Sequence, residues 1–158
     1  MPQSRRWSLT VERFLMAGEI RLPPGMESDA SVERGFLFWM DDSVSGWDAV
    51  SAELEAAFVG SRNAASNEEP IVYVVTNDAL LGRAGPEAAM VASGLLSGAR
   101  TAAIEGSRKG WTVNTIAYDP DHADTAAIIE KAVWLMGDGS ITGELIHVGP
   151  GHIGKALA

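Results

Sequence analysis

Polar side chains follow directly on three short apolar runs of the sequence, and their types could bind or transform a small molecule. They are Asp41, Asp42, Asn77, Tyr118 and Asp119. If the runs are parallel strands, their carboxyl ends meet at one edge of the sheet, where ligands of open α/β folds bind. A desolvated carboxyl at Asp41 or Asp119 could act as a general acid or base. The spacing selects no reaction, and a solvated polar rim is the plainer interpretation.

Metal and nucleophile patterns are absent from the sequence. The three histidines, His122, His147 and His152, include no i,i+4 pair on an expected helix and no H-E-x-x-H motif. The chain has no cysteine, which excludes thiolate ligands, disulfides and cysteine nucleophiles. A Ser-His-Asp arrangement could be assembled, but no G-x-S-x-G elbow supports it. We therefore expect no metal site.

One glycine motif lies near the end of the chain. Residues 149–154, GPGHIG, match G-x-G-x-x-G after an expected strand. Only four residues follow, so we expect no helix there to receive a phosphate. Coincidence is the favoured interpretation, and a truncated or permuted nucleotide-binding domain is the alternative.

Strand and helix patterns alternate from about residue 35 onward. Strands are expected over residues 35–40, 71–76, 112–117 and 143–148, and helices over residues 45–65, 86–110 and 124–136. This alternation predicts βαβ units with right-handed crossovers. The expected fold is α/β with three layers: a mostly parallel, Rossmann-like sheet with helices on both faces.

Local signals place the helix starts. Ser45 and Asp48 resemble a capping box, Pro86 suits a first helical position, and Asp124 can cap the third helix. Residues 35–158 are expected to form one domain. Residues 1–34 stand outside the pattern, and their apolar side chains could form a strand or hairpin that covers the open side of the sheet. These are Trp7, Leu9, Val11, Phe14, Leu15, Met16, Ile20 and Leu22.

The charge balance excludes some partners. The chain has 158 residues and a formal net charge of -9, and its basic residues form no stripe. Nucleic acid and anionic membrane surfaces are therefore not expected partners. No signal-peptide core and no run of about 18 apolar residues occurs, so we expect a cytoplasmic protein.

The helix after Pro86 has one side that is nearly bare. Ser93, Gly94, Ser97 and Gly98 follow at spacings that share a face, and each interior glycine costs about 1 kcal/mol relative to alanine. The small side chains let another backbone approach closely. Two interpretations stay open: close packing of this helix on its own sheet, and a subunit interface that also includes Phe58.

Several stretches resemble the short-chain dehydrogenase/reductase family. "GWDAV…ELEAAFVGSRNAA" is similar to the family's W-D-x-V followed by N-L-x-x-x-F, and "IVYVVTN" to its I-V-N-I-S-S strand. "MVASGLLSGARTAAIEGSRKGWTVNTIAYD" resembles Y-x-A-S-K-A-A-x-x-x-x-T-x-x-L-A-x-E followed by V-N-x-I-x-P-G, and "ITGELIHVGPG" the closing I-T-G-Q-x-I-x-V-D-G-G. The resemblance runs from roughly residue 35 to 151. It implies the C-terminal half or more of the family's fold.

The resemblance also implies that the family's catalytic chemistry is lost. The catalytic tyrosine falls on Met90, the lysine on Gly94, the serine on Asn77 and the helix asparagine on Glu53. A thioether has no proton to donate, and a glycine has no ammonium to lower a phenol's pKa. This makes the chain a truncated, degenerate member of the family.

The resemblance does not include the family's cofactor half. Its glycine-rich first βα turn would lie before the matched region, and Asp41 and Asp42 stand where negative charge opposes a pyrophosphate. No cofactor is therefore expected, and NAD(P) would apply only to a working oxidoreductase.

Three functions follow from these observations. The first is a non-catalytic subunit or scaffold that forms a homodimer, or a heteromer with a full-length dehydrogenase, because the family pairs these two helices across a two-fold axis. The second is a small-molecule-binding protein or enzyme with a re-purposed cleft at the strand ends. The third is an NAD(P)-dependent oxidoreductase.

Overall fold

Five parallel strands form the centre of the molecule in a computed structural model that describes residues 18–150 apart from 123. The elements are β1 (Glu19–Arg21), β2 (Phe36–Trp39), α1 (Trp47–Ser66), β3 (Ile71–Thr76), α2 (Asn77–Leu80), α3 (Pro86–Ser107), β4 (Val113–Tyr118), α4 (Thr125–Gly137) and β5 (Leu145–Val148). The order in the sheet is β1-β2-β3-β4-β5, and each neighbouring pair is parallel. The four strands and three helices expected from the sequence are present, and β1 and α2 are additional.

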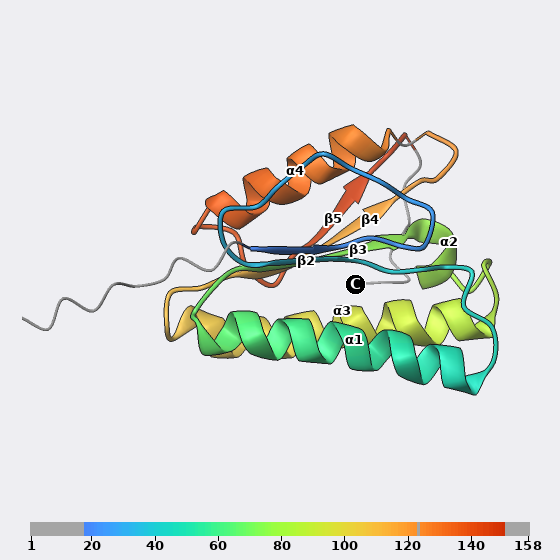
Figure 1. Cartoon of the computed structure of the whole chain (residues 1–158), viewed down its shortest axis with the longest axis horizontal. Coiled ribbons are helices and arrows are strands. Elements are labelled where there is room, and N and C mark those ends of the chain that lie inside the picture. Colours follow the sequence, from blue (N-terminus) through green and yellow to red (C-terminus); the bar gives the residue numbers. More distant parts are fainter. Residues whose placement is uncertain (1–17, 123, 151–158) are drawn as a thin grey trace, which may run out of the picture.

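Helices cover both faces of the sheet (Figure 1). Helices α1 and α3 lie side by side on one face, over a core that includes Phe38, Tyr73 and Val113. Helix α4 covers the other face, over Leu37 and Ile116. The central strands β2, β3 and β4 are buried on both sides, which explains why they read as continuous apolar runs rather than alternating ones. The predicted three-layer α/β fold is confirmed.

The prediction that all crossovers are right-handed is wrong. Every strand pair is parallel and the strand order follows the chain, so each crossover moves the chain by one strand in the same direction. Because α1 and α3 cross on one face and α4 crosses on the other, β4–α4–β5 has the opposite hand to the first two βαβ units. The general rule favours one hand, but it competes here with the need to cover apolar residues on the second face.

The segment before residue 35 contributes to the sheet. Strand β1 pairs with β2, with Glu19 opposite Phe36 and Arg21 opposite Phe38. The chain then returns along the α4 face, where Val32 is buried in the core of that side. Ile20 and Leu22 pack against the same core. The remaining apolar residues of the expected strand or hairpin, from Trp7 to Met16, lie outside the described residues.

Two of the three predicted helix starts are correct. Pro86 is at the first position of α3, and the Asp124 side chain accepts a hydrogen bond from the Ala126 N–H at 3.0 Å. Helix α1 has Gly46 as its N-cap residue, with a φ of 82° and no side-chain cap. The capping box predicted at Ser45 is therefore wrong, because the positive φ turn at Gly46 places the helix start one residue later.

Candidate functional site

Asp41 and Asp119 lie at the carboxyl ends of β2 and β4 and stabilise turns there. Asp41 Oδ1 accepts hydrogen bonds from the Ser43 backbone N–H at 2.9 Å and from its hydroxyl at 2.6 Å. Asp119 Oδ1 accepts one from the Asp121 N–H at 3.0 Å, and its Oδ2 lies 3.0 Å from His122 Nδ1. Both carboxylates close local turns, as aspartates often do after strands.

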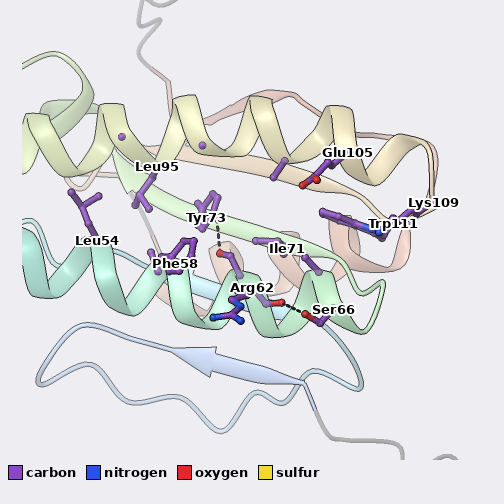
Figure 2. A pocket seen from close by; sticks show the side chains of 16 residues that line it. Leu54, Phe58, Arg62, Ser66, Ile71, Tyr73, Leu95, Glu105, Lys109 and Trp111 are labelled. Carbon is purple, nitrogen blue, oxygen red and sulfur yellow. Dashed lines mark hydrogen bonds between the residues drawn. The ribbon is translucent and has the colours of Figure 1, made fainter.

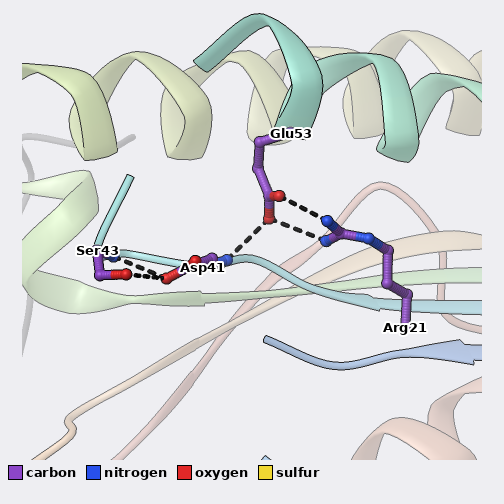
Figure 3. A network of polar contacts seen from close by, with 4 residues as sticks. All are labelled: Arg21, Asp41, Ser43 and Glu53. Atoms are coloured by element: carbon purple, nitrogen blue, oxygen red, sulfur yellow. Dashed lines mark hydrogen bonds and ion pairs between the residues drawn. The ribbon is translucent and has the colours of Figure 1, made fainter. Parts of the chain in front are cut away.

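Glu53 is buried at the same edge of the sheet and joins three segments of the chain (Figure 3). Its Oε2 lies 2.8 Å and its Oε1 3.1 Å from the two Nη atoms of Arg21 in β1. The Asp41 backbone N–H donates to Glu53 Oε1 at 2.8 Å. Such a bidentate arrangement is the strongest form of this ion pair. No sequence pattern indicated this ion pair, because the partners are 32 residues apart in the chain.

Tyr118 is half-buried at the end of β4, where Trp39 contacts it. The Trp39 indole N–H donates to the Tyr118 hydroxyl at 3.1 Å, and the two rings meet edge to face at 5.1 Å between centroids. Burial raises the pKa of Tyr118 above its ordinary value, and the negative charge of Asp42 adds to this. The hydrogen bond from Trp39 opposes both effects. The phenol is therefore neutral near pH 7 and available as a hydrogen-bond donor.

Asn77 follows β3 and contacts a histidine from the far end of the chain. His147 Nδ1 in β5 lies 3.1 Å from Asn77 Oδ1. The other ring nitrogen, His147 Nε2, is buried and has no hydrogen-bond partner among the described residues. The structure thus brings together Asn77 and His147, which sequence reasoning treated separately.

Met90 and Gly94 lie on the exposed side of α3. Met90 is half exposed, and a Cβ added at Gly94 would stand 3.2 Å from Leu54 Cδ2 of α1. Of the four positions matched to the family's catalytic residues, Asn77 follows β3 directly at the rim. Glu53 reaches the rim from α1 and is held there by Arg21.

The segment after β1 does not fit a dinucleotide. Parallel folds hold a pyrophosphate with the N–H groups of a glycine-rich turn and the following helix N-terminus. Here residues 22–35 connect β1 to β2 without a helix. Pro23 and Pro24 open this segment and have no N–H to donate.

Metal ligands do not cluster in the described part of the chain. Among residues 18–150 without 123, no group of three histidine or acidic side chains could hold a metal ion. His152 and most of the motif at 149–154 lie outside the described residues. In the same part of the chain, no helix is both long and apolar enough to cross a membrane.

The outward side of α1 and α3 exposes large apolar side chains between small ones. We call this surface the helix-pair face, and it comprises Phe58, Val59, Met90, Ser93, Gly94, Ser97, Gly98 and Ile104. Phe58 and Ile104 are 64% and 65% exposed. A Cβ added at Gly98 would contact nothing within 4 Å, so this glycine does not serve packing on the sheet. Gly60 does so, because a Cβ there would overlap Phe36 of β2, and Gly106 allows Trp111 of the loop before β4 to pack against α3.

A groove runs between α1 and α3 beside this face (Figure 2). It has a volume of about 520 Å³. Its floor includes Ile71 and Tyr73, and Trp111 and Lys109 lie toward one end. The Tyr73 and Ser61 hydroxyls share a hydrogen bond of 2.6 Å, and burial raises the pKa of Tyr73 while this hydrogen bond opposes the shift. We call this the helix groove. The sequence pointed to its walls at Phe58, Gly94 and Gly98 but did not indicate its floor.

Comparison with solved structures shows the fold. The chain is similar to an oxidoreductase of the short chain dehydrogenase/reductase class from Brucella ovis, with 16% identity and a TM-score of 0.56 over 73% of this chain and 68% of that one. A short-chain oxidoreductase from Brucella ovis in complex with a partially ordered NAD is 16% identical, with a TM-score of 0.56 over 73% of this chain and 65% of that one. Enoyl-[acyl-carrier-protein] reductase (NADH) from Aquifex aeolicus VF5 is 16% identical, with a TM-score of 0.59 over 72% of this chain and 59% of that one.

These similarities define the class of fold: a Rossmann-like α/β sheet of the kind found in short-chain dehydrogenases/reductases. The chain spans between 59% and 68% of the length of these proteins. No protein-family model matches the sequence. No curated protein is similar to it in sequence either.

Proposed function

We propose that this chain is a non-catalytic subunit with a reductase-like fold, and that it acts by pairing through the helix-pair face. The partner is a second copy or a full-length short-chain dehydrogenase/reductase. The observation that carries the proposal is the exposure of Phe58, Val59, Met90 and Ile104 on two adjacent helices. Clustered apolar side chains of this size typically mark interaction sites.

The energetics favour pairing at this face. Burying one phenylalanine or isoleucine side chain contributes about 1.5–3 kcal/mol, and Phe58 and Ile104 are both largely exposed. Between them, Gly94 and Gly98 present no side chain, so the backbone of a partner helix could approach α3 closely. The large side chains of Phe58 and Ile104 can insert into a partner, and the bare backbone at Gly94 and Gly98 can receive the partner's side chains.

A non-catalytic role is supported by the residues at the matched positions. Met90 and Gly94 offer neither a proton nor an ammonium. Glu53 is already bound to Arg21, and Asp41 and Asp119 accept hydrogen bonds within turns. We therefore propose no reductase activity for this chain.

The mass of the chain in solution tests the proposal. Light scattering after gel filtration should give at least twice the monomer mass, or a stoichiometric complex with a dehydrogenase should be recovered by a tagged chain from its native host. Phe58→Glu should abolish the pairing because it places a charge in a desolvated contact. Trp134→Glu is the matched control, since Trp134 is 60% exposed on α4, on the opposite face. A monomer that recovers no partner would refute the proposal.

A ligand cleft at the strand ends is the second candidate function. Two observations favour it: the neutral, half-buried phenol of Tyr118 and the unpartnered His147 Nε2. Saturable binding of a small molecule that Tyr118→Ala removes would support this candidate over the first. Equal binding by the variant would contradict it.

A further inference from the structure

We propose that the helix groove binds an elongated, apolar carboxylic acid, with its carboxylate at the end near Trp111. The groove volume of about 520 Å³ lies within the range of about 300–1,000 Å³ that holds small molecules in proteins. The proposal goes beyond pairing and does not rest on it, because every group that it names belongs to one chain. The groove and the helix-pair face share Phe58, Gly94 and Gly98, so a bound ligand and a partner helix would compete for this surface.

The length and lining of the groove suit an apolar chain. Its α1 wall extends from Leu54 to Ser66, which is about 18 Å along a helix. Ala57 of α1 and Ala102 of α3 line its walls, and Ile71 lies on the floor. The Tyr73 hydroxyl is hydrogen-bonded to Ser61, so this polar pair is already satisfied within the protein.

The end near Trp111 has the features that bind a carboxylate (Figure 2). Trp111 is only 4% exposed, and its indole N–H has no hydrogen-bond partner among the described residues. A buried donor without an acceptor is rare in proteins and calls for an explanation. A carboxylate offers two acceptor oxygens and would satisfy it.

The charges at this end favour an anion. Arg62 and Lys109 line the groove, and neither forms an ion pair with a described residue. Along the whole groove two cations stand against one carboxylate, that of Glu105. Lys109 is the cation beside Trp111, whereas Arg62 lies farther along α1, near Phe58 (Figure 2). An alcohol or an amine of the same length would gain less, because the first is neutral and the second meets like charges.

Calorimetric titration of the full chain with sodium decanoate tests the proposal. We expect saturable binding with one decanoate per chain, and binding of decanol that is about tenfold weaker, as expected when a charge-assisted contact is lost. Lys109→Gln and Trp111→Phe should each weaken decanoate binding severalfold. Lys131→Gln is the matched control, because it removes one positive charge on α4 and should leave the dissociation constant unchanged.

A blocking variant separates the groove from the apolar surface around it. A side chain added at Gly98 meets nothing within 4 Å at its Cβ, so Gly98→Leu should fold, which circular dichroism checks, and should fill the groove. Decanoate binding should then be lost. Undiminished binding to Gly98→Leu, equal affinity for decanol, or no saturation below the micelle concentration would each overturn the proposal. If the chain is monomeric and binds decanoate, the proposed pairing is refuted and the groove proposal is supported.

Discussion

The carboxylate of Glu53 stabilises the structure through two separate contacts, with the guanidinium of Arg21 and the backbone N–H of Asp41. It is buried in α1, whereas Arg21 is about one-third exposed in the edge strand β1. Arg21 also lies over the Phe38 ring, at 4.7 Å from its centroid. The short strand β1 is therefore anchored to α1 as well as to β2.

Removing the charge of Glu53 should destabilise the fold. We expect Glu53→Gln to lower the free energy of unfolding by about 1–3 kcal/mol, because Arg21 loses a charge-assisted contact and solvent screens the remainder. Urea denaturation measures this. Glu55→Gln, at an exposed position of the same helix, is the control and should change stability little. Equal effects of the two variants would contradict a specific role for the ion pair.

The two tyrosines should make the fold sensitive to alkali. Burial raises the pKa of both Tyr73 and Tyr118 above the ordinary value of 10.0. An unfolded chain then loses these protons at a lower pH than the folded chain, so the stabilisation present below pH 10 is lost as the pH rises through the folded-state pKa values. Urea denaturation at two pH values below and two above the ordinary tyrosine pKa of about 10 measures this loss. Tyr73→Phe should reduce the loss, and an unchanged slope would contradict the assignment.

At the scale of elements, the glycines of α1 and α3 divide into two groups. Gly60 lets α1 approach β2, because a Cβ there would overlap the Phe36 ring. Gly98 has open space beside it and lies on the helix-pair face. Helix packing on the sheet therefore explains one glycine but not the other, although the sequence presents both as small residues in a helix.

Alanine substitutions at these two glycines should have opposite effects on stability. Gly98→Ala should raise the free energy of unfolding by up to about 1 kcal/mol through helix propensity. Gly60→Ala should lower it by about 1–3 kcal/mol, because the added methyl group overpacks the core. Thermal denaturation of each purified variant, compared with the unchanged chain, measures the two changes in stability. The same sign of change at both positions would contradict the packing described for α1.

How much of the fold the sequence predicts depends on how local each signal is. The strands at 71–76 and 113–118 and the start of α3 at Pro86 follow from short apolar runs and from the fixed φ of proline. The sequence left a strand or a hairpin open before residue 35. It did not locate β1, because three residues carry too little pattern and pairing with β2 defines the strand. The opposite hand of the β4–α4–β5 unit also escaped prediction, because it depends on which face remains uncovered after α1 and α3 have packed.

At the scale of the whole molecule, the connection from β1 to β2 limits what the fold can bind. In nucleotide-binding parallel folds, a helix begins after the first strand and receives the phosphate. Here residues 22–35 form a loop that packs against the α4 side, and Val32 is buried there. The likeness to the solved oxidoreductases therefore lies in the sheet and its covering helices, and the β1–β2 connection of this chain contains no such helix (Figure 1).

NADPH should neither bind saturably to the isolated chain nor be oxidised by it. The physical reasons are the missing N–H groups at Pro23 and Pro24 and the lack of a proton donor at Met90. Fluorescence titration with NADPH measures binding, and the absorbance of NADPH in the presence of carbonyl substrates measures turnover. A full-length dehydrogenase is the positive control. Saturable binding with turnover would restore the oxidoreductase interpretation.

The sequence by itself determined the class of fold, the alternation of strands and helices, and the small residues on one side of α3, because these depend on spacing within one element. The tertiary structure alone decided which distant residues meet: Arg21 with Glu53, Trp39 with Tyr118, and Asn77 with His147. It also decided that Asp41 and Asp119 close turns, and that the helix groove has a floor at Tyr73. Contacts between residues far apart in the chain depend on how whole elements pack, and no local spacing specifies that.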